Sequence, residues 1–353
     1  MAVPEYDVVV VGASFAGLAV ARRLSGRVLL VDRHEIGAVQ TSACGTPLWV
    51  PRALGVEDSV LQVHDRLVLR TPARTVTYDL SAVPFCTFDY GQFCRGLLAQ
   101  SRATFVRAGV LSMDGDEVVT TEGRFRGGVV VDASGWRGAL VNGPAAPPPA
   151  RGLCSFGLET RVDLPGSDLA FWLDQRLFPR GLGWVFPVGT GVLVGQGSYT
   201  GVSKLRDTVD RFARQLGGAP SSYHGTYFPN RLLRSTVGRI FAVGDAAGQC
   251  LPLTAEGIRP ALYFGGECGA LVQEVLDGRL TLAEALARYR TLVDGYRWAY
   301  RVLSVAQWLA THAPTRLFAL VTELANRRPF RPRWWPRYGC FGRIEPAAVP
   351  WAS

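Results

Sequence analysis

Several features that mark other protein classes are scarce or absent in this 353-residue sequence. The seven cysteines are odd in number and show no C-x-x-C spacing, which favours reduced thiols in a cytosolic protein over a disulfide framework or a zinc site. The four histidines are isolated, so we expect no metal site. No apolar run is long enough to form a membrane-spanning helix, and we expect no signal peptide, because the first residues lead directly into a strand.

Lysine is almost missing as well. Lys204 is the only one, so the 38 basic residues are nearly all arginine, and the formal net charge is +9. A basic surface favours anionic partners such as phosphorylated substrates, membrane lipids or nucleic acid. Because no nucleic-acid-binding motif accompanies the charge, we expect no nucleic-acid partner.

The N-terminal stretch has the order strand, glycine turn, helix, strand and acid. A β-branched run at 6–11 leads into a turn with Gly12 and Gly17, then a helix, a second strand and Asp32. In a dinucleotide-binding βαβ unit, this turn and the helix N-terminus approach a pyrophosphate, and an acid about 20 residues further on binds the ribose. Ser14 stands where the middle glycine of G-x-G-x-x-G is usual. The stretch therefore predicts dinucleotide binding.

Two later stretches repeat the pattern of a buried strand that runs into a turn of small residues. One contains Asp132 and Gly135, and the other contains Gly244 and Asp245. The three turns together resemble the FAD-binding domain of the para-hydroxybenzoate hydroxylase superfamily. There the aspartate of the third motif lies at the ribityl chain and pyrophosphate of FAD. The resemblance therefore implies FAD as the cofactor, because an enzyme that binds only NAD would not need the third turn.

Three further segments resemble the geranylgeranyl reductase family within this superfamily. They are the pair Cys44–Gly45, the W-x-F-P stretch at 181–187 and the loop at 252–258. Members of the family reduce carbon–carbon double bonds of polyprenyl chains on lipids, chlorophyll precursors or quinones. Leu182 and Ala255 depart from the family pattern, in which these positions are often aromatic and glycine. Both departures bear on the substrate side of the flavin.

The resemblance also implies roles for individual residues. Contacts with the cofactor are expected from Gly12, Ser14, Phe15, Ala16, Gly17, Asp32, Arg33, Cys44, Gly45, Gln92, Asp132, Gly135, Gly244, Asp245, Pro252, Gly257 and Ile258. Substrate-pocket walls are expected from Phe171, Trp172, Trp184, Phe186 and Tyr199, each of which has a plain core position as its alternative. Cys44 is the expected catalytic residue, which either assists proton delivery or shapes the pocket. The alternative is a small buried core residue.

The length allows two domains, or one domain with a large insertion. We expect an α/β fold: a Rossmann-like FAD-binding domain with a mixed sheet, an antiparallel β-sheet substrate domain and a C-terminal helical region. The expected boundaries are 1–60, 85–150 and 235–280 for the FAD-binding domain, 61–84 and 151–234 for the substrate domain, and 281–353 for the helical region with its basic aromatic tail.

The expected reaction is reduction of double bonds in an apolar isoprenoid or lipid by hydride transfer from reduced flavin. The electron donor is unidentified and is either NAD(P)H or ferredoxin-like. Three alternatives stay open: an FAD-dependent monooxygenase that uses NAD(P)H and O2, a non-redox lycopene cyclase relative suggested by Glu159, and a flavin-bearing scaffold. Arginines and tryptophans from 297 to 337 fit either peripheral membrane contact or a helical cap with a solvated tail, on an otherwise cytoplasmic protein.

Overall fold

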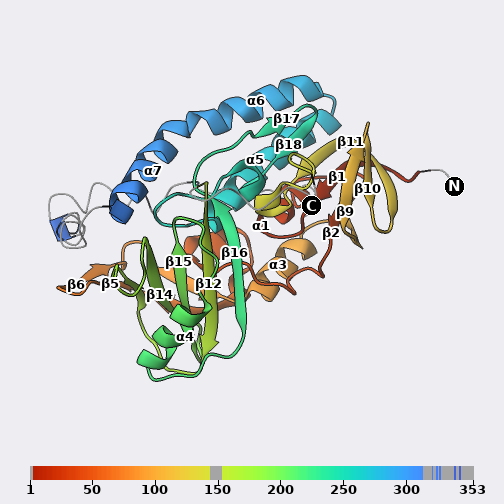
Figure 1. Cartoon of the computed structure of the whole chain (residues 1–353). Coiled ribbons are helices and arrows are strands. Elements are labelled where there is room, and N and C mark those ends of the chain that lie inside the picture. The colour runs from red at the N-terminus through yellow and green to blue at the C-terminus, as the bar shows by residue number, and fades with distance from the viewer. Residues whose placement is uncertain are drawn as a thin grey trace.

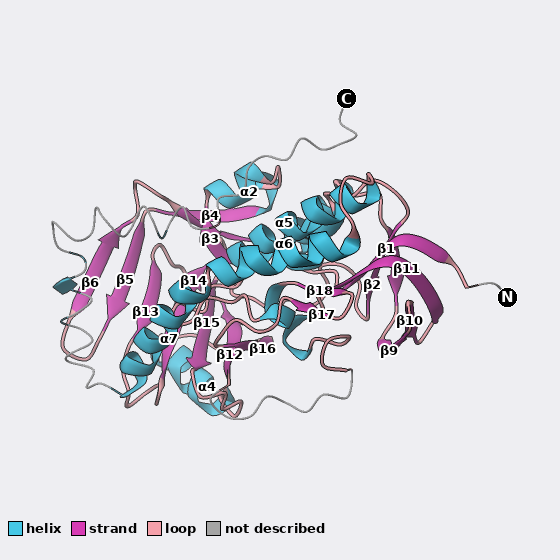
Figure 2. Ribbon diagram, turned by 90° about the horizontal axis from the view of Figure 1, so that it is seen from above, coloured by secondary structure: helices cyan, strands magenta, loops and turns pink. Residues whose placement is uncertain are grey.

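The computed structural model describes residues 3–143 and 153–312, together with residues 320, 323, 324, 326, 338 and 342. The proline-rich break at 144–149, the basic tail at 327–337 and Cys340 lie outside the described residues. Two large sheets and a set of helices make up the fold (Figures 1 and 2). The predicted α/β plan with a helical C-terminal region is confirmed.

The first sheet contains the three predicted turns at the ends of its strands. Its parallel core has the order β18-β11-β1-β2-β8, with β17 and the hairpin β9–β10 added in antiparallel pairs. The bounds are β1 (Glu5–Val11), β2 (Val28–Asp32), β8 (Thr104–Arg107), β9 (Val110–Asp114), β10 (Glu117–Thr120), β11 (Gly123–Asp132), β17 (Thr236–Val237) and β18 (Ile240–Ala242). The central strands contain continuous buried apolar runs, namely 8–11, 28–31 and 129–131, because both faces of the sheet are covered there.

Helices α1 (Phe15–Ala21) and α5 (Ile258–Leu276) pack against each other beside this sheet. Their backbones approach closely because Gly265 has no side chain: a Cβ there would lie 2.6 Å from the Ala16 carbonyl oxygen. The close packing brings the N-termini of both helices to the same region of the molecule. The main hydrophobic core lies beneath them and includes Leu18 and Phe264.

The second sheet has the order β16-β12-β15-β14-β13-β5-β6 and lies below the helices in Figure 1. Its pairs are antiparallel, as predicted, except that β13 and β5 run parallel. The bounds are β5 (Arg66–Arg70), β6 (Thr75–Asp79), β12 (Cys154–Val162), β13 (Leu169–Trp172), β14 (Gly181–Pro187), β15 (Val192–Ser198) and β16 (Tyr223–Pro229).

The remaining elements connect and cover the two sheets. A small sheet contains β3 (Gly45–Pro47), β4 (Val60–His64) and β7 (Phe85–Phe88), and the other helices are α2 (Trp49–Ala53), α3 (Tyr90–Ala99), α4 (Arg206–Gln215), α6 (Leu282–Gly295) and α7 (Arg297–His312). Within the described ranges, no helix combines the length and apolar content needed to cross a bilayer. The six described cysteines are free and buried. The domain boundaries given above stay a prediction.

Candidate active site

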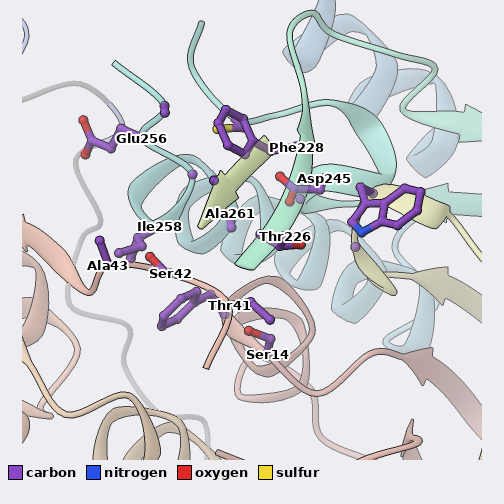
Figure 3. Close-up of a pocket in the computed structure, with 18 of the residues that line it drawn as sticks. Ser14, Thr41, Ser42, Ala43, Thr226, Phe228, Asp245, Glu256, Ile258 and Ala261 are labelled. Atoms are coloured by element: carbon purple, nitrogen blue, oxygen red, sulfur yellow. The ribbon is translucent and has the colours of Figure 1, made fainter. Parts of the chain in front are cut away.

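A cavity of about 1030 Å³ is lined by residues of both large sheets and by the N-terminal turns of α1 and α5. Figure 3 shows its walls, with the loop residues Thr41, Ser42 and Ala43 near Ser14 and with Asp245 on another segment. The predicted residues that line it are Gly12, Ser14, Phe15, Ala16, Asp32, Arg33, Gly45, Gly135, Phe171, Trp184, Phe186, Tyr199, Gly244, Asp245, Gly257 and Ile258. The structure thus brings together segments that are far apart in the chain.

The first turn requires glycine at two positions for steric reasons. Gly12 has a φ of +102°, and a Cβ there would lie 2.2 Å from the Ala133 carbonyl oxygen. Gly17 does not line the cavity; it lets α1 approach the turn, since its Cβ would lie 1.8 Å from the Gly12 carbonyl oxygen. The Ser14 hydroxyl is hydrogen-bonded to the Tyr90 hydroxyl at 2.9 Å, and it does not cap the helix. The first N–H groups of α1 therefore have no side-chain cap.

Asp32 ends β2 at the edge of the cavity and orders the backbone around it. Its Oδ2 accepts a hydrogen bond from the Ala13 N–H at 2.8 Å, and its Oδ1 accepts one from the His34 N–H at 2.9 Å. Each carboxylate oxygen can accept more than one hydrogen bond. Asp32 therefore keeps acceptor capacity toward the cavity.

Asp245 is different, because no hydrogen-bond donor among the described residues reaches its carboxylate. It lies in the 3-10 turn Gly244–Ala247 that follows β18, and it lines the cavity. Its depth removes it from bulk water, and this desolvation raises its pKa to about 7. Because none of the described residues donates a hydrogen bond to this desolvated carboxyl group, it is suited to accept hydrogen bonds from the hydroxyl groups of a ligand.

Asp132, a predicted contact of the cofactor, is fully buried and does not line the cavity. Its Oδ1 accepts hydrogen bonds from the Ser134 N–H at 3.0 Å and the Ser134 hydroxyl at 2.5 Å. Its Oδ2 accepts from the N–H groups of Leu140 and Val141 at 2.8 and 3.0 Å. Asp132 therefore fixes the second turn from behind, while Gly135 faces the cavity.

Two more predicted contacts with the cofactor do not line the cavity. Gln92 lies in the first turn of α3 and is exposed; its backbone N–H donates to Asp89 Oδ1 at 2.6 Å. Pro252 is buried behind the loop that it begins.

The loop between Pro252 and Gly257 is held in a strained conformation at the start of α5. Leu253 and Ala255 are not glycine, yet their φ angles are 66° and 54°. The Leu253 carbonyl accepts from the Tyr199 hydroxyl at 2.5 Å, and the Leu253 N–H donates to Gln307 Oε1 at 2.8 Å. Gly257 has no side-chain cap, so the N-terminus of α5 faces the cavity uncapped.

Cys44 lies beside the cavity wall but does not form it. Its side chain is buried, and its thiol donates to the Ser42 carbonyl oxygen at 3.3 Å. Burial raises the pKa of this thiol well above its ordinary value, with the negative charge of Glu159 adding to the effect. The thiol is therefore protonated at neutral pH, and the adjacent Gly45 is the residue that reaches the cavity. The catalytic role predicted for Cys44 stays a prediction.

The second sheet contributes a flat aromatic wall. The Trp184 indole crosses its neighbouring strands over a glycine trough, which we define as Gly157, Gly195 and Gly197. A Cβ on Gly195 would lie 2.3 Å from the indole, whereas a Cβ on Gly157 or Gly197 would lie 3.5 Å from it. At the far end, Trp184 Nε1 donates to Glu159 Oε2 at 2.7 Å. The sequence motifs did not indicate this trough, although the spacing Gly195-x-Gly197 on one strand is consistent with it.

One end of the cavity is apolar, and we call it the apolar arm. Its lining residues are Leu67, Leu69, Tyr78, Leu80, Phe85, Leu169, Phe171, Leu173 and Phe186. Phe171 and Phe186 pack edge to face with ring centroids 5.3 Å apart. Trp172, a predicted wall residue, does not line the cavity. Successive strand residues point to opposite faces, and Trp172 packs on Phe212 of α4 behind the sheet.

The comparisons with known proteins agree with this arrangement. No family model matches the sequence. The protein named digeranylgeranylglycerophospholipid reductase 2 of Methanopyrus kandleri is 26% identical over 339 residues, which cover 81% of each chain. The digeranylgeranylglycerophospholipid reductase of Methanocaldococcus jannaschii is 27% identical over 316 residues, covering 78% of each chain.

Solved structures share the fold. A geranylgeranyl bacteriochlorophyll reductase-like protein of Thermoplasma acidophilum has a TM-score of 0.81, with 18% identity over 93% of both chains. HpxO of Klebsiella pneumoniae, solved with FAD and uric acid, has a TM-score of 0.68, with 17% identity over 97% of both chains. The structural neighbours include FAD-dependent flavoproteins, and the named relatives cover most of the chain. The chain is therefore a relative of the geranylgeranyl reductase family, as its motifs predicted.

Proposed function

We propose that this protein is an FAD-dependent reductase of carbon–carbon double bonds in isoprenoid chains. The observation that carries the proposal is the composition of one continuous cavity. The three small-residue turns form one part of this cavity, and the apolar arm forms the other part. The relatives' names supply the chemistry, since they are reductases of geranylgeranyl lipids.

The residues present fit FAD. The uncapped N-termini of α1 and α5 offer backbone N–H groups to anionic parts of the cofactor, namely the pyrophosphate and the flavin edge. Asp245 would accept hydrogen bonds from ribityl hydroxyls, and Asp32 from the ribose. Gly12 keeps the turn open, because any side chain there would collide with the Ala133 backbone. When bound, reduced flavin supplies a hydride to the substrate.

The remaining parts of the wall orient the substrate and exclude water. The apolar arm would take a polyprenyl chain by burying it against aliphatic and aromatic side chains. Trp184 would form a flat floor beside the reacting double bond, because the glycine trough and Glu159 fix its indole. Phe186 and Gly45 are close neighbours at the passage between the arm and the turns.

An anaerobic single-turnover experiment tests this function without requiring the physiological electron donor. The FAD-loaded protein is reduced with dithionite, mixed with a geranylgeranyl lipid and followed by flavin absorbance and product mass. We expect flavin reoxidation together with two added hydrogens for each double bond. A saturated phytanyl lipid is the matched control and should leave the flavin reduced. A flavin that stays reduced until oxygen is admitted, and then forms a hydroxylated product, would instead favour the monooxygenase alternative.

We also propose that α7 contacts a membrane surface next to the cavity. Its outward face carries Trp298, Val302, Val305, Trp308 and Leu309, and the exposed fractions of Trp298 and Val305 are 75% and 58%. Exposed Arg297 and Arg301 lie on the same helix and would face anionic head groups. On the inward side, Leu303 and Ala310 line the cavity. A lipid substrate could therefore enter the apolar arm beside the helix that touches the bilayer.

A further inference from the structure

A buried carboxylate on the sheet wall of the cavity holds an imidazole and an indole together. Glu159 is only 3% exposed, and its Oε2 accepts a hydrogen bond from Trp184 Nε1 at 2.7 Å. Its other oxygen, Oε1, is hydrogen-bonded to Nε2 of His224. All three residues line the cavity. The cluster therefore lies beside the space proposed for the substrate.

The strand register explains why these residues meet on one face. Glu159 on β12 is paired with His224 on β16 and with Gly195 on β15, and Gly195 is paired with Trp184 on β14. Residues paired in this way across neighbouring strands point to the same side of a sheet. Thr226, two positions after His224, faces the pocket in Figure 3. The His224 side chain is therefore on the cavity side as well.

Burial of the Glu159–His224 pair costs free energy that a purely structural role would not explain. The exposed fractions of the two side chains are 4% for Glu159 and 20% for His224. Removing a carboxylate from water carries a penalty that hydrogen bonds only offset, and apolar residues of similar volume often stabilise a fold as well or better. An acid paired with an imidazole on a largely apolar cavity wall is typical of a functional site.

We propose that His224 is the proton donor of the reduction and that Glu159 is the positioning residue that orients its ring. This inference rests on the proposed function. A carboxylate bonded to one ring nitrogen fixes the tautomer and orientation of the imidazole, balances the charge of the imidazolium and leaves the second nitrogen for the substrate. The hydrogen bond from Trp184 keeps the carboxylate in place. Cys44 is worse placed for this task, because its thiol donates to the Ser42 carbonyl behind the wall.

The step balances as a two-electron reduction of the double bond. One alkene carbon would gain the hydride that bound reduced flavin would supply, which would oxidise the cofactor and break the π bond. The other carbon gains the proton of a His224 N–H bond, and the electrons of the π bond form this second C–H bond. The imidazole is left neutral and regains its proton from solvent.

The test compares His224→Ala with Tyr223→Phe in the FAD-loaded, dithionite-reduced protein under anaerobic conditions. Tyr223 is the preceding residue on the same strand, and its hydroxyl bonds to Asp210 away from the cavity. We expect His224→Ala to slow the reoxidation of flavin by a geranylgeranyl lipid by about 100-fold or more, the range of a lost general acid. Added imidazole should restore part of the rate, and Tyr223→Phe should behave as the unaltered protein.

A second readout uses the apoprotein and does not depend on turnover. The chain has four histidines, so 15N-labelled histidine gives few resonances. In the apoprotein, Glu159→Gln should shift the ring nitrogen signals of His224 alone, while lipid binding, followed by tryptophan fluorescence, is retained. In the FAD-loaded protein, the same substitution should slow the reduction. If His224→Ala keeps the full rate, or loses it without rescue by imidazole, the inference is overturned while the proposed function stands. If the unaltered protein does not reduce the lipid at all, the proposed function itself fails.

Discussion

At the scale of single residues, the loop that leads into α5 contains two of the four described non-glycine residues with a left-handed φ, the others being Cys44 and Arg180. The left-handed φ angles of Leu253 and Ala255 each cost roughly 1–2 kcal/mol relative to ordinary backbone. Hydrogen bonds from Tyr199 and to Gln307 hold this loop in place on both sides of Leu253. The strained segment is thus part of the cavity wall, which is where such strain is usually found.

The substitution Ala255→Gly should therefore stabilise the protein. Glycine removes the steric cost of the left-handed conformation, and its greater freedom in the unfolded chain offsets part of this gain. We expect the free energy of unfolding to rise by about 0.5–1 kcal/mol in a denaturant titration. Ala270→Gly, in the middle of α5, is the matched control and should lower it by about 1 kcal/mol. A loss of stability in Ala255→Gly would show that the strain is not significant.

The carboxyl group of Asp245 should make the stability of the apoprotein depend on pH. Its pKa is raised from 3.8 to about 7 on folding, so the folded state favours the protonated form. This contribution is fully present below about pH 4, is lost as the pH rises through about 7, and changes little above that. Urea midpoints of the apoprotein should therefore fall over this range more steeply than those of Asp245→Asn. Parallel pH profiles for the two proteins would contradict the raised pKa.

Among the structural elements, helix ends and strand faces determine how the site is built. Asp89 is the N-cap of α3, because its carboxylate accepts a hydrogen bond from the Gln92 N–H at 2.6 Å. The face of β15 toward the cavity has no side chains at Gly195 and Gly197, and their absence leaves room for the indole of Trp184 to lie flat against the strand. An isolated strand would be weakened by such glycines, so their presence marks a close approach by another group.

The glycine trough gives a matched pair of substitutions. Gly195→Ala places a Cβ 2.3 Å from the indole of Trp184, so the ring must move, and we expect a loss of about 1–3 kcal/mol in the free energy of unfolding. Gly157→Ala places its Cβ at 3.5 Å, an ordinary contact, and should be tolerated. Denaturant titrations and near-ultraviolet circular dichroism measure both effects. Equal behaviour of the two variants would show that Trp184 is not fixed in the trough.

Across the whole molecule, α6 and α7 follow one another over the top of the fold in Figure 1, and Figure 2 shows α7 above the second sheet. The inward side of α7 makes apolar and polar contacts: Tyr300 and Leu303 pack in the main core, Gln307 accepts a hydrogen bond from the Leu253 N–H, and the Ser304 hydroxyl donates to the Asn230 carbonyl at 3.1 Å. The outward side nevertheless exposes several large apolar side chains, Trp298 and Val305 among them. A group of exposed apolar side chains of this kind favours an external apolar partner.

Membrane binding through α7 can be measured with vesicles of phosphatidylcholine and phosphatidylglycerol. We expect the protein to sediment with anionic vesicles, less strongly at high salt, because arginines and apolar side chains both contribute. Trp298→Glu combined with Val305→Glu should reduce binding at least tenfold. Leu111→Glu is the control, since Leu111 is 49% exposed on the distant strand β9. If the protein forms concentration-dependent dimers and does not bind vesicles, the exposed surface of α7 binds a second copy of the chain, and the membrane proposal is wrong.

The local sequence determined the nucleotide-binding part of the protein. Gly12, Gly17 and Asp32 follow from short-range rules, because a buried strand, a turn that needs glycine and a helix lie next to one another in the chain. Short-range rules also explain the N-cap at Asp89, whose carboxylate bonds to a backbone N–H three residues further along the chain.

The tertiary structure decided what lies on the other side of the cavity. Glu159, Trp184 and His224 are far apart in the chain, and only the register of four strands brings them into one row. It also turned Asp132 and Trp172 away from the cavity, because a buried turn and the alternation of a strand fix which way a side chain points. Composition and motifs do not determine the register between strands, because the register is set when the two sheets pack together.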